Sequence, residues 1–572
     1  MLFFRRIGVV GTLLVVASGV CSGEIVHVNQ NWTKLESEEF WDMPHGSQLI
    51  PWSWFSCLEK AGGRGAFASF ENLSKYGFVY RGGGGEAGEL PIGFVKDGKL
   101  DWLGMNCAAC HTAQISHGDD LIQIEGAPGM IDLDQFLIDL TEAIEATFND
   151  AAKFQRFSDR VLNSKQSPSE EQLLKLKLRW LLDRRLAYND RNHTGAGQFP
   201  PREPWGPGRI DAFGAILNQV TALRLQVEAN AKPADAPVSI PFLWDTPQHD
   251  HVQWNGVASN GEVLGEEFGA LGRNTGEVLG VFGEVRVHDN SLGLWPGYPS
   301  SVRFDELKRA ERLVETLWSP EWPEEVFNHP LDNDRVAQGR QLYHAKKCVR
   351  CHALINRTDP NRKAKEVLVK IGNGQQEPQE FVGTDPLMAK NFDTMRETGM
   401  LEGRTKNFLP LNAKFGRMAR AEEILSHVVL GAIIHSPVNE DQELPPQPGF
   451  AMAARHPQVY KARPLNGIWA TAPFLHNGSV PSLRALLSSD RPKKFWVGHR
   501  EFSPEDVGFV QDGDQVIERD LFQYDTSKVG NSNQGHVYGA QPFEWSENGV
   551  SEVIKALTDE EREALLEFLR SL

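Results

Sequence analysis

The chain has 572 residues, of which 40% are apolar and 24% are charged, and its formal net charge is −17. This is an ordinary globular composition, and the length indicates two or three domains. The negative charge makes nucleic acid an unsuitable partner, because such a surface repels phosphates.

The first residues have the pattern of a secretory signal peptide. Two arginines precede an apolar run over residues 7–20, and small residues follow it. The run is too short for a stable membrane span. We therefore expect residues 1–23 to be removed and the mature protein to be periplasmic or secreted. Lipid attachment at Cys21 is the alternative, but Val20 stands where a small residue is wanted before a lipidated cysteine.

The first motif with clear chemistry is Cys107-x-x-Cys110-His111. This is the attachment pattern of a c-type haem, in which each thiol forms a thioether with a vinyl group and the histidine becomes the proximal iron ligand. Apolar residues at helical spacing over 131–152 and 173–186 follow, so the first domain is expected to be mainly helical.

The composition of the chain changes between residues 198 and 300, where short segments are separated by Pro, Gly, Trp and Asn. Long irregular loops are uncommon in a compact protein unless they build a site or a lid. We expect aromatic loops in this region to shape the distal pocket of a porphyrin.

A second copy of the motif, Cys348-x-x-Cys351-His352, follows a predicted helix. The two Cys-x-x-Cys pairs could instead form one zinc ribbon or two redox dithiols. Neither alternative explains why a histidine directly follows both pairs. The motifs therefore predict two covalently bound c-type haems, whose iron is held by His111 and His352.

The chain ends with a predicted helix over residues 557–572, in which Thr558 and Glu561 form a capping box. These features together predict a mainly α fold with two cytochrome c-like haem domains, long irregular loops and few short strands. We expect an N-terminal haem domain with an aromatic loop insertion over residues 24–330 and a C-terminal cytochrome c-like domain over residues 331–572.

Spacing alone does not choose the distal ligand of the second haem. The candidates are side chains able to bind iron in the C-terminal half: His427, His435, His476, His499, His536, Met388, Met395, Met400, Met418 and Met452.

The run over residues 463–480, with Gly535 and His536 further on, resembles the secreted di-haem cytochromes related to bacterial cytochrome c peroxidase. Within that superfamily the chain is most similar to the rubber oxygenase group. Segments along nearly the whole mature chain resemble segments found in the same order in this group. The resemblance implies that His111 and His352 are proximal ligands and that His536 is the sixth ligand of the second haem. The first haem would then be the open one.

The resemblance also implies a particular distal pocket at the first haem. The peroxidases proper carry a distal histidine where this chain has Ala127, which argues against peroxide cleavage by a distal histidine. The rubber-oxygenase-like pocket uses aromatic residues instead, and Trp205 and Phe213 are the candidates here. Trp205 is also a candidate for an electron path between the haems.

We therefore expect a haem-dependent oxidoreductase that activates dioxygen or peroxide at the first haem, with a rubber-oxygenase-like dioxygenase favoured. A di-haem peroxidase, a plain electron carrier and an enzyme that oxidises another protein are the alternatives. The expected partners are dioxygen or peroxide, an apolar organic substrate and a small electron-transfer protein. The sequence leaves open whether calcium lies between the domains.

Overall fold

The computed structural model describes residues 25–86, 88–97, 100–163, 167–197, 201–260, 268–288, 297–364, 367–371, 382–406, 413–435, 458–511, 521–547 and 550–572. The predicted signal peptide and Met452 lie outside these residues.

The helices lie in both halves of the chain. They are α1 (Lys34–Asp42), α2 (Trp52–Phe55), α3 (Phe70–Ser74), α4 (Leu133–Asn149), α5 (Ala151–Val161), α6 (Pro168–His193), α7 (Ala212–Leu217), α8 (Phe268–Gly280), α9 (Phe304–Thr316), α10 (Glu324–Phe327), α11 (Asn333–Ala345), α12 (Leu387–Phe392), α13 (Ala421–His435), α14 (Leu483–Leu486) and α15 (Asp559–Arg570).

The strands are short and pair in many small sheets. Two sheets have three strands. The first contains, in spatial order, β1 (Ile25–His27), β6 (Asp120–Glu125) and β5 (Thr112–His117). The second contains β2 (Ile50–Pro51), β4 (Trp102–Met105) and β3 (Phe94–Lys96). The paired strands are β7 (Arg209–Ile210) with β8 (Val238–Ser239), β9 (His251–Val252) with β10 (Ala258–Ser259), β11 (Val367–Lys370) with β14 (Val459–Ala462), β12 (Met395–Glu397) with β13 (Met418–Arg420), β15 (Lys494–Val497) with β18 (Phe522–Asp525), β16 (Phe502–Ser503) with β17 (Gly508–Phe509), and β19 (Phe543–Glu547) with β20 (Val550–Ile554).

The prediction of a mainly α fold with few strands is wrong. Among the described residues 38% are helical and 17% lie in strands, and the strands form many small sheets. Most of these strands have two to five residues. Runs so short hold only one or two periods of apolar alternation, so they cannot be recognised in the sequence.

The long helices agree better with their sequence patterns. Residues 131–152 contain α4, and residues 173–186 lie inside α6. The capping box at the last helix is confirmed, because the Thr558 hydroxyl accepts from the Glu561 amide at 3.1 Å and Glu561 accepts from the Thr558 amide at 3.0 Å.

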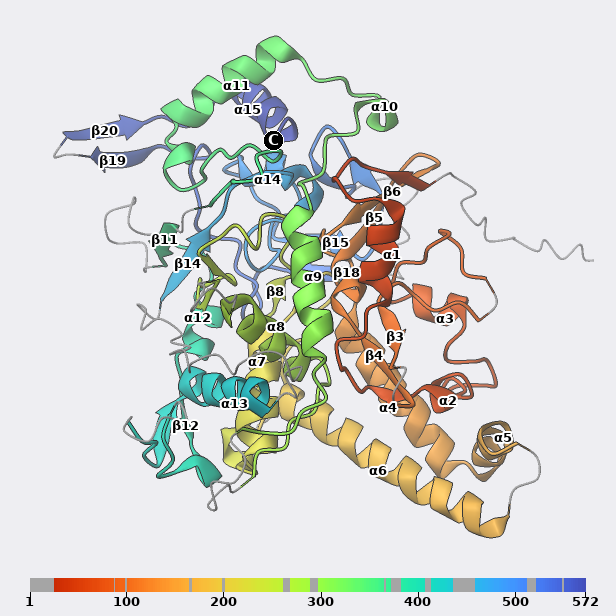
Figure 1. The fold of residues 1–572 in the computed structure, drawn as a ribbon. Coiled ribbons are helices and arrows are strands. Elements are labelled where there is room, and N and C mark those ends of the chain that lie inside the picture. Colours follow the sequence, from red (N-terminus) through yellow and green to blue (C-terminus); the bar gives the residue numbers. More distant parts are fainter. Residues whose placement is uncertain are drawn as a thin grey trace, which may run out of the picture.

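Helices α11 and α15 pack together beside the second motif (Figure 1). Gly339 lies at their contact, where an added Cβ would come within 2.0 Å of the Ala564 carbonyl oxygen. Only glycine allows this close approach of the two backbones. The packing fixes α11, which leads directly to Cys348.

An apolar core crosses the predicted boundary between residues 330 and 331. It joins Ile122 and Trp244 to Trp469 and Leu566, all of which are fully buried. The backbone amide of Ser116 in β5 also donates to the Arg500 carbonyl at 2.7 Å. The two halves of the chain therefore share one hydrophobic core.

Helix α9 runs through the centre of the molecule, between the N-terminal elements and the C-terminal ones (Figure 1). Helix α6 extends along one edge, with α4 and α5 beside it. Within the described residues, no helix combines the length and the apolar character needed to cross a bilayer.

Candidate functional site

The second motif forms a single tight turn at the end of α11. Residues Cys348–Arg350 form a 3-10 helix, and the His352 amide donates to the Cys348 carbonyl at 2.9 Å. The Tyr343 hydroxyl, on α11, donates to the His352 carbonyl at 2.7 Å. This turn directs both thiols and the imidazole into one cavity.

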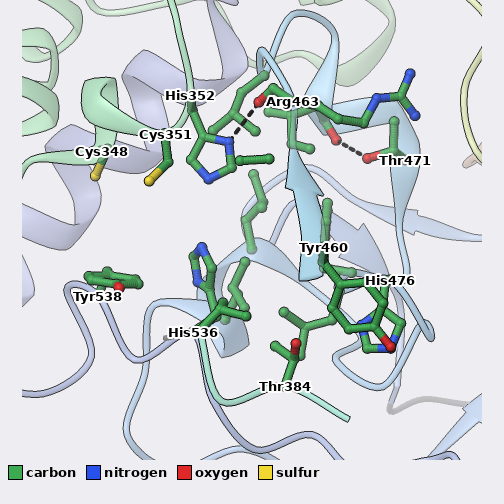
Figure 2. Close-up of a pocket in the computed structure, with 18 of the residues that line it drawn as sticks. Cys348, Cys351, His352, Thr384, Tyr460, Arg463, Thr471, His476, His536 and Tyr538 are labelled. Atoms are coloured by element: carbon green, nitrogen blue, oxygen red, sulfur yellow. Dashed lines mark hydrogen bonds between the residues drawn. The ribbon is translucent and has the colours of Figure 1, made fainter. Parts of the chain in front are cut away.

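That space, the C-terminal cavity, has a volume of about 230 Å³ and is lined by Cys348, Cys351, His352 and His536 among mostly apolar side chains. Figure 2 shows the two imidazoles pointing toward each other across it, with both thiols to one side. The ring centroids of His352 and His536 are 6.0 Å apart. Two imidazole nitrogens that bind one metal ion from opposite sides at about 2.1 Å place their ring centres about 6.5 Å apart, which is close to this separation. The pair therefore fits two axial ligands of one iron.

The protonation of these side chains also suits that role. The Nδ1 atom of His352 lies 2.6 Å from the Arg463 carbonyl, so this nitrogen donates and the other nitrogen is free to bind a metal. Burial lowers the pKa of His536 to about 3, which keeps its imidazole neutral. Burial raises the pKa of the Cys348 thiol to about 12.

The loop that carries His536 is held firmly. The His536 amide donates to the Val382 carbonyl at 2.7 Å, and the Arg491 guanidinium donates to the His536 carbonyl at 2.8 Å. Gly535 has a φ of +76°, and an added Cβ would lie 2.2 Å from the Gly383 carbonyl carbon. Glycine at this position therefore lets the loop approach Gly383 and bring His536 into the cavity.

Other candidate ligands lie elsewhere. His476 lines the same cavity, but its ring packs against the Tyr460 ring with centroids 4.1 Å apart and lies away from the His352–His536 pair in Figure 2. His427 is buried in α13, where the Tyr298 hydroxyl lies 2.8 Å from its Nε2 atom. Met395 and Met418 are exposed on β12 and β13.

The first motif repeats the same turn. Residues Cys107–Ala109 form a 3-10 helix, and the His111 amide donates to the Cys107 carbonyl at 2.9 Å. Asn106 fixes this turn, because its side-chain amide donates to three carbonyls at the end of α1 and its oxygen accepts from the Ala108 amide. An added Cβ at Gly93 would lie 2.1 Å from the Ala109 nitrogen, so the motif packs directly on backbone.

Cys107, Cys110 and His111 open into a second space, the N-terminal cavity, with a volume of about 210 Å³. Phe213 lines this cavity, as the sequence predicted for a pocket residue. Burial lowers the pKa of His111 to about 4, so this imidazole is also neutral. Among the described residues His111 makes no ring contact like that between His352 and His536; the other imidazole of this cavity, His45, contacts the Cys107 sulfur instead.

A histidine that the sequence interpretation missed lies in this cavity. His45 is 2% exposed, and its Nδ1 atom is 3.5 Å from the Cys107 sulfur. Burial lowers its pKa to about 4. His45 therefore contacts the thiol of the motif; it lies outside both Cys-x-x-Cys-His motifs, so the sequence interpretation did not single it out.

Trp205 is fully buried but is absent from the described linings of both cavities. Its indole N–H donates to the Ala234 carbonyl at 2.7 Å, and the Arg202 guanidinium lies 4.3 Å from its ring centroid. The Trp205 carbonyl accepts from Arg209, which also donates to Asn531 at 2.7 Å. Trp205 thus connects the first half of the chain to the loop that carries His536.

The two cavities share one wall. Residues 239–242 line both of them, together with Trp254, Lys461 and Arg463. The Trp254 indole donates to the Ser239 carbonyl at 2.9 Å, which fixes the ring in this wall. Groups held in the two cavities would therefore be neighbours.

The shared wall also carries buried positive charge. The Arg463 guanidinium lies 3.5 Å from the Phe242 ring centroid, and its Nε atom is buried without a hydrogen-bond partner. Burial lowers the Arg463 pKa to about 9, so it stays charged at neutral pH. Lys461 is 5% exposed. The buried carboxylate of Asp245 interacts electrostatically with this guanidinium, and the Nε atom remains as a donor that a haem propionate would satisfy.

This geometry decides against one alternative from the sequence. The two Cys-x-x-Cys pairs line different cavities, so they do not form one zinc ribbon. Among the described residues, no cluster of three or more His, Cys, Asp or Glu side chains has a metal-binding arrangement.

Comparison with known proteins agrees with the haem interpretation. Residues 459–497 match the family model described as RoxA-like, cytochrome c-like. The chain is also similar to an uncharacterized protein of Sinorhizobium fredii (strain NBRC 101917 / NGR234), y4iJ, at 29% identity over 96% of this chain and 93% of that protein. A second uncharacterized protein of the same strain, y4iM, is 39% identical over 14% of this chain and 20% of its own length. The matched segment contains Arg463 and His476, and it supports a relationship to the rubber oxygenase group and a covalently bound haem.

Proposed function

We propose that the chain is an extracytoplasmic di-haem oxidoreductase that activates dioxygen or peroxide in the N-terminal cavity. The observation that carries this proposal is the asymmetry between the cavities. In the C-terminal cavity His352 faces His536 at 6.0 Å, whereas His111 has no such partner among the described residues. One iron would have two protein ligands and the other would keep one position free.

A c-type haem iron supplies one-electron chemistry and a binding position for dioxygen or peroxide. The chain supplies the rest. Cys107 and Cys110 would hold the group through thioethers, and His111 would bind its iron. Phe213 and its apolar neighbours keep water out and leave room for an apolar molecule, which favours a rubber-oxygenase-like dioxygenase.

The C-terminal cavity then serves electron transfer or tuning. His352 and His536 would hold the metal on both sides, so little would reorganise when an electron arrives. The shared wall with Phe242 and Trp254 supports exchange between the two groups. A small electron-transfer protein would be the outside partner.

A peroxidase is the second candidate, because a carboxyl lies in the N-terminal cavity. Glu277 of α8 lines it, burial raises the pKa of this carboxyl, and the Gln253 amide donates to it at 2.6 Å. A carboxyl whose pKa is raised by burial is a candidate for the acid that peroxide cleavage requires in place of a distal histidine. Glu277→Gln should then abolish peroxide turnover while leaving oxygenation of an apolar substrate intact.

Carbon monoxide binding to the reduced holoprotein tests the main proposal. We expect carbon monoxide to perturb the spectrum of one haem, and Phe213→Ala to change its affinity by about ten-fold without loss of covalent haem. A reduced spectrum that carbon monoxide leaves unchanged would mean that both irons are closed. The protein would then be an electron carrier, or a peroxidase that opens only in mixed valence.

A further inference from the structure

Helix α6 carries an apolar stripe on its outer surface. Leu173, Leu176 and Trp180 are 52%, 63% and 55% exposed, although a single exposed leucine would be unremarkable. Their spacing of three and four residues brings them to one side of the helix. Leu174 and Leu178, on the opposite side, are buried in the core. The exposed stripe is therefore additional to the face that packs on the protein.

Neighbouring residues extend this stripe. The Trp102 ring meets the Trp180 ring edge-on, with centroids 6.5 Å apart. Leu100, two residues earlier, is 46% exposed. The apolar surface thus continues from α6 onto the loop before β4, and we call Leu100, Trp102, Leu173, Leu176 and Trp180 the α6 patch.

Positive charge flanks the α6 patch. Lys175, Lys177 and Arg179 are exposed on α6. Two exposed carboxylates belong to the same surface: Asp183 pairs with Arg179, and Asp101, between Leu100 and Trp102, lies 4.0 Å from Lys96. Within the described residues no ion pair involves Lys175 or Lys177, so these two lysines keep the surface positive. On a helical projection Lys177 lies on one side of the stripe and Lys175 and Arg179 lie on the other. This surface is positive although the whole chain carries a formal charge of −17.

We propose that the α6 patch docks the protein on the surface of a lipid bilayer with anionic headgroups. Leucine and tryptophan beside lysine and arginine are the composition of helices that lie in the membrane interface. Helix α6 has 26 residues and lies along an edge of the molecule, so it can approach a flat surface over much of its length (Figure 1). The apolar side chains enter the headgroup boundary, and the cations attract the lipid phosphates.

Charge argues against a second copy of the chain as the occupant. A symmetric dimer brings the same patch of both copies together. Both sets of unpaired lysines would then enter one interface and repel each other, whereas anionic lipid neutralises them. The positive charge therefore selects the bilayer over self-association.

Co-sedimentation of the full holoprotein with vesicles tests this proposal. We expect binding to vesicles of equal parts phosphatidylglycerol and phosphatidylcholine and much weaker binding to pure phosphatidylcholine. Lys177→Gln should weaken partition by about five-fold, because each cation near an anionic surface contributes about 1 kcal/mol. Trp180→Gln should weaken it by about ten-fold. Val553→Gln on β20 is the matched control, since Val553 is 69% exposed and remote from α6.

Three outcomes would overturn the proposal. Equal binding to both kinds of vesicle would remove the role of charge. Unchanged binding by both α6 variants, with circular dichroism confirming their fold, would assign the contact to another surface. A dimer in light scattering that Trp180→Gln abolishes would make a second copy the occupant.

Discussion

The imidazole rings of His352 and His536 face each other across a cavity with their centroids 6.0 Å apart, although 183 residues separate them in the chain. A tight turn after α11 positions His352, and a loop clamped by Arg491 positions His536. A turn and a distant loop therefore fix the distance between the two rings, and this distance suits two imidazole nitrogens bound to one metal ion.

His536→Ala should convert one haem from low spin to a high-spin or water-bound form. Loss of a strong-field imidazole weakens the axial field, while His352 and both thioethers keep the haem attached. Electronic and paramagnetic spectra measure the change. His476→Ala is the control, because His476 lines the same cavity but its ring packs against Tyr460. Retention of the low-spin signal in the first variant and its loss in the second would transfer the ligand role to His476.

Cys107→Ala and Cys348→Ala should each abolish the stable attachment of one haem. Each substitution removes one of the two thioethers that the motif supplies. Acid-acetone extraction and haem staining of a denaturing gel measure what remains bound. Cys57→Ala is the control, because Cys57 lies outside both cavity linings in the described structure. An unchanged haem content in either motif variant would contradict the count of two.

The sequence predicted the local parts of the site because local chemistry determines them. Each Cys-x-x-Cys-His motif lies on one turn, so its residues reach one cavity whatever the rest of the chain does. His536 and Phe213 came from resemblance, and both line the cavities expected of them. The ligand role of His536 and the catalytic roles of Phe213 and Trp205 stay predictions.

The shared wall could not be predicted in the same way. Phe242 and Trp254 meet Lys461 and Arg463 only after residues 239–254 pack against β14, far away in the chain. No periodicity or spacing in the sequence records such a contact. The prediction of the fold class was wrong for a related reason. Strands as short as Arg209–Ile210 depend on tertiary pairing and leave no pattern of their own in the sequence.

Arg463→Gln should lower the midpoint potentials of both haems. A buried positive charge beside both cavities stabilises the reduced iron, so its removal favours the oxidised state. We expect a shift of about 60 mV, which is a ten-fold change in a one-electron equilibrium. Potentiometric titration with optical detection measures it. Arg500→Gln is the control, because Arg500 donates to Gln114 and Phe78 outside the cavity linings. A shift in the midpoint potential of only one haem would contradict a role of Arg463 at both haems.

Trp205→Phe should lower the free energy of unfolding by about 1–3 kcal/mol, because the Ala234 carbonyl loses its donor and stays buried. Chemical denaturation measures this loss, and Trp180→Phe on the surface is the control. Carbon monoxide affinity is the second readout. A change in affinity at full stability would support the pocket role that the resemblance implied for Trp205.

Asp134→Asn should weaken the fold at neutral pH and flatten its acid dependence. Burial raises the pKa of Asp134, but hydrogen bonds from His193 and Arg202 outweigh burial and hold this pKa well below its ordinary value. The unfolded chain therefore binds a proton at Asp134 before the folded one does. The interaction of Asp134 with Arg202 and His193 therefore stabilises the fold above about pH 4. This contribution is lost as the pH falls toward the pKa of Asp134 in the folded state.

Denaturant titrations across the acid range measure this effect. We expect Asp134→Asn to cost about 3 kcal/mol at pH 7, as removal of one partner from a buried ion pair does. Asp183→Asn should cost at most about 0.5 kcal/mol, because Asp183 and Arg179 are exposed. Arg202 lies over the Trp205 ring, and Arg209 donates to the Trp205 carbonyl, so Asp134 and Trp205 belong to one network. The double variant should therefore lose less unfolding free energy than the sum of the losses of Asp134→Asn and Trp205→Phe. Full additivity would mean that Asp134 stabilises the fold independently of the loop that carries Trp205.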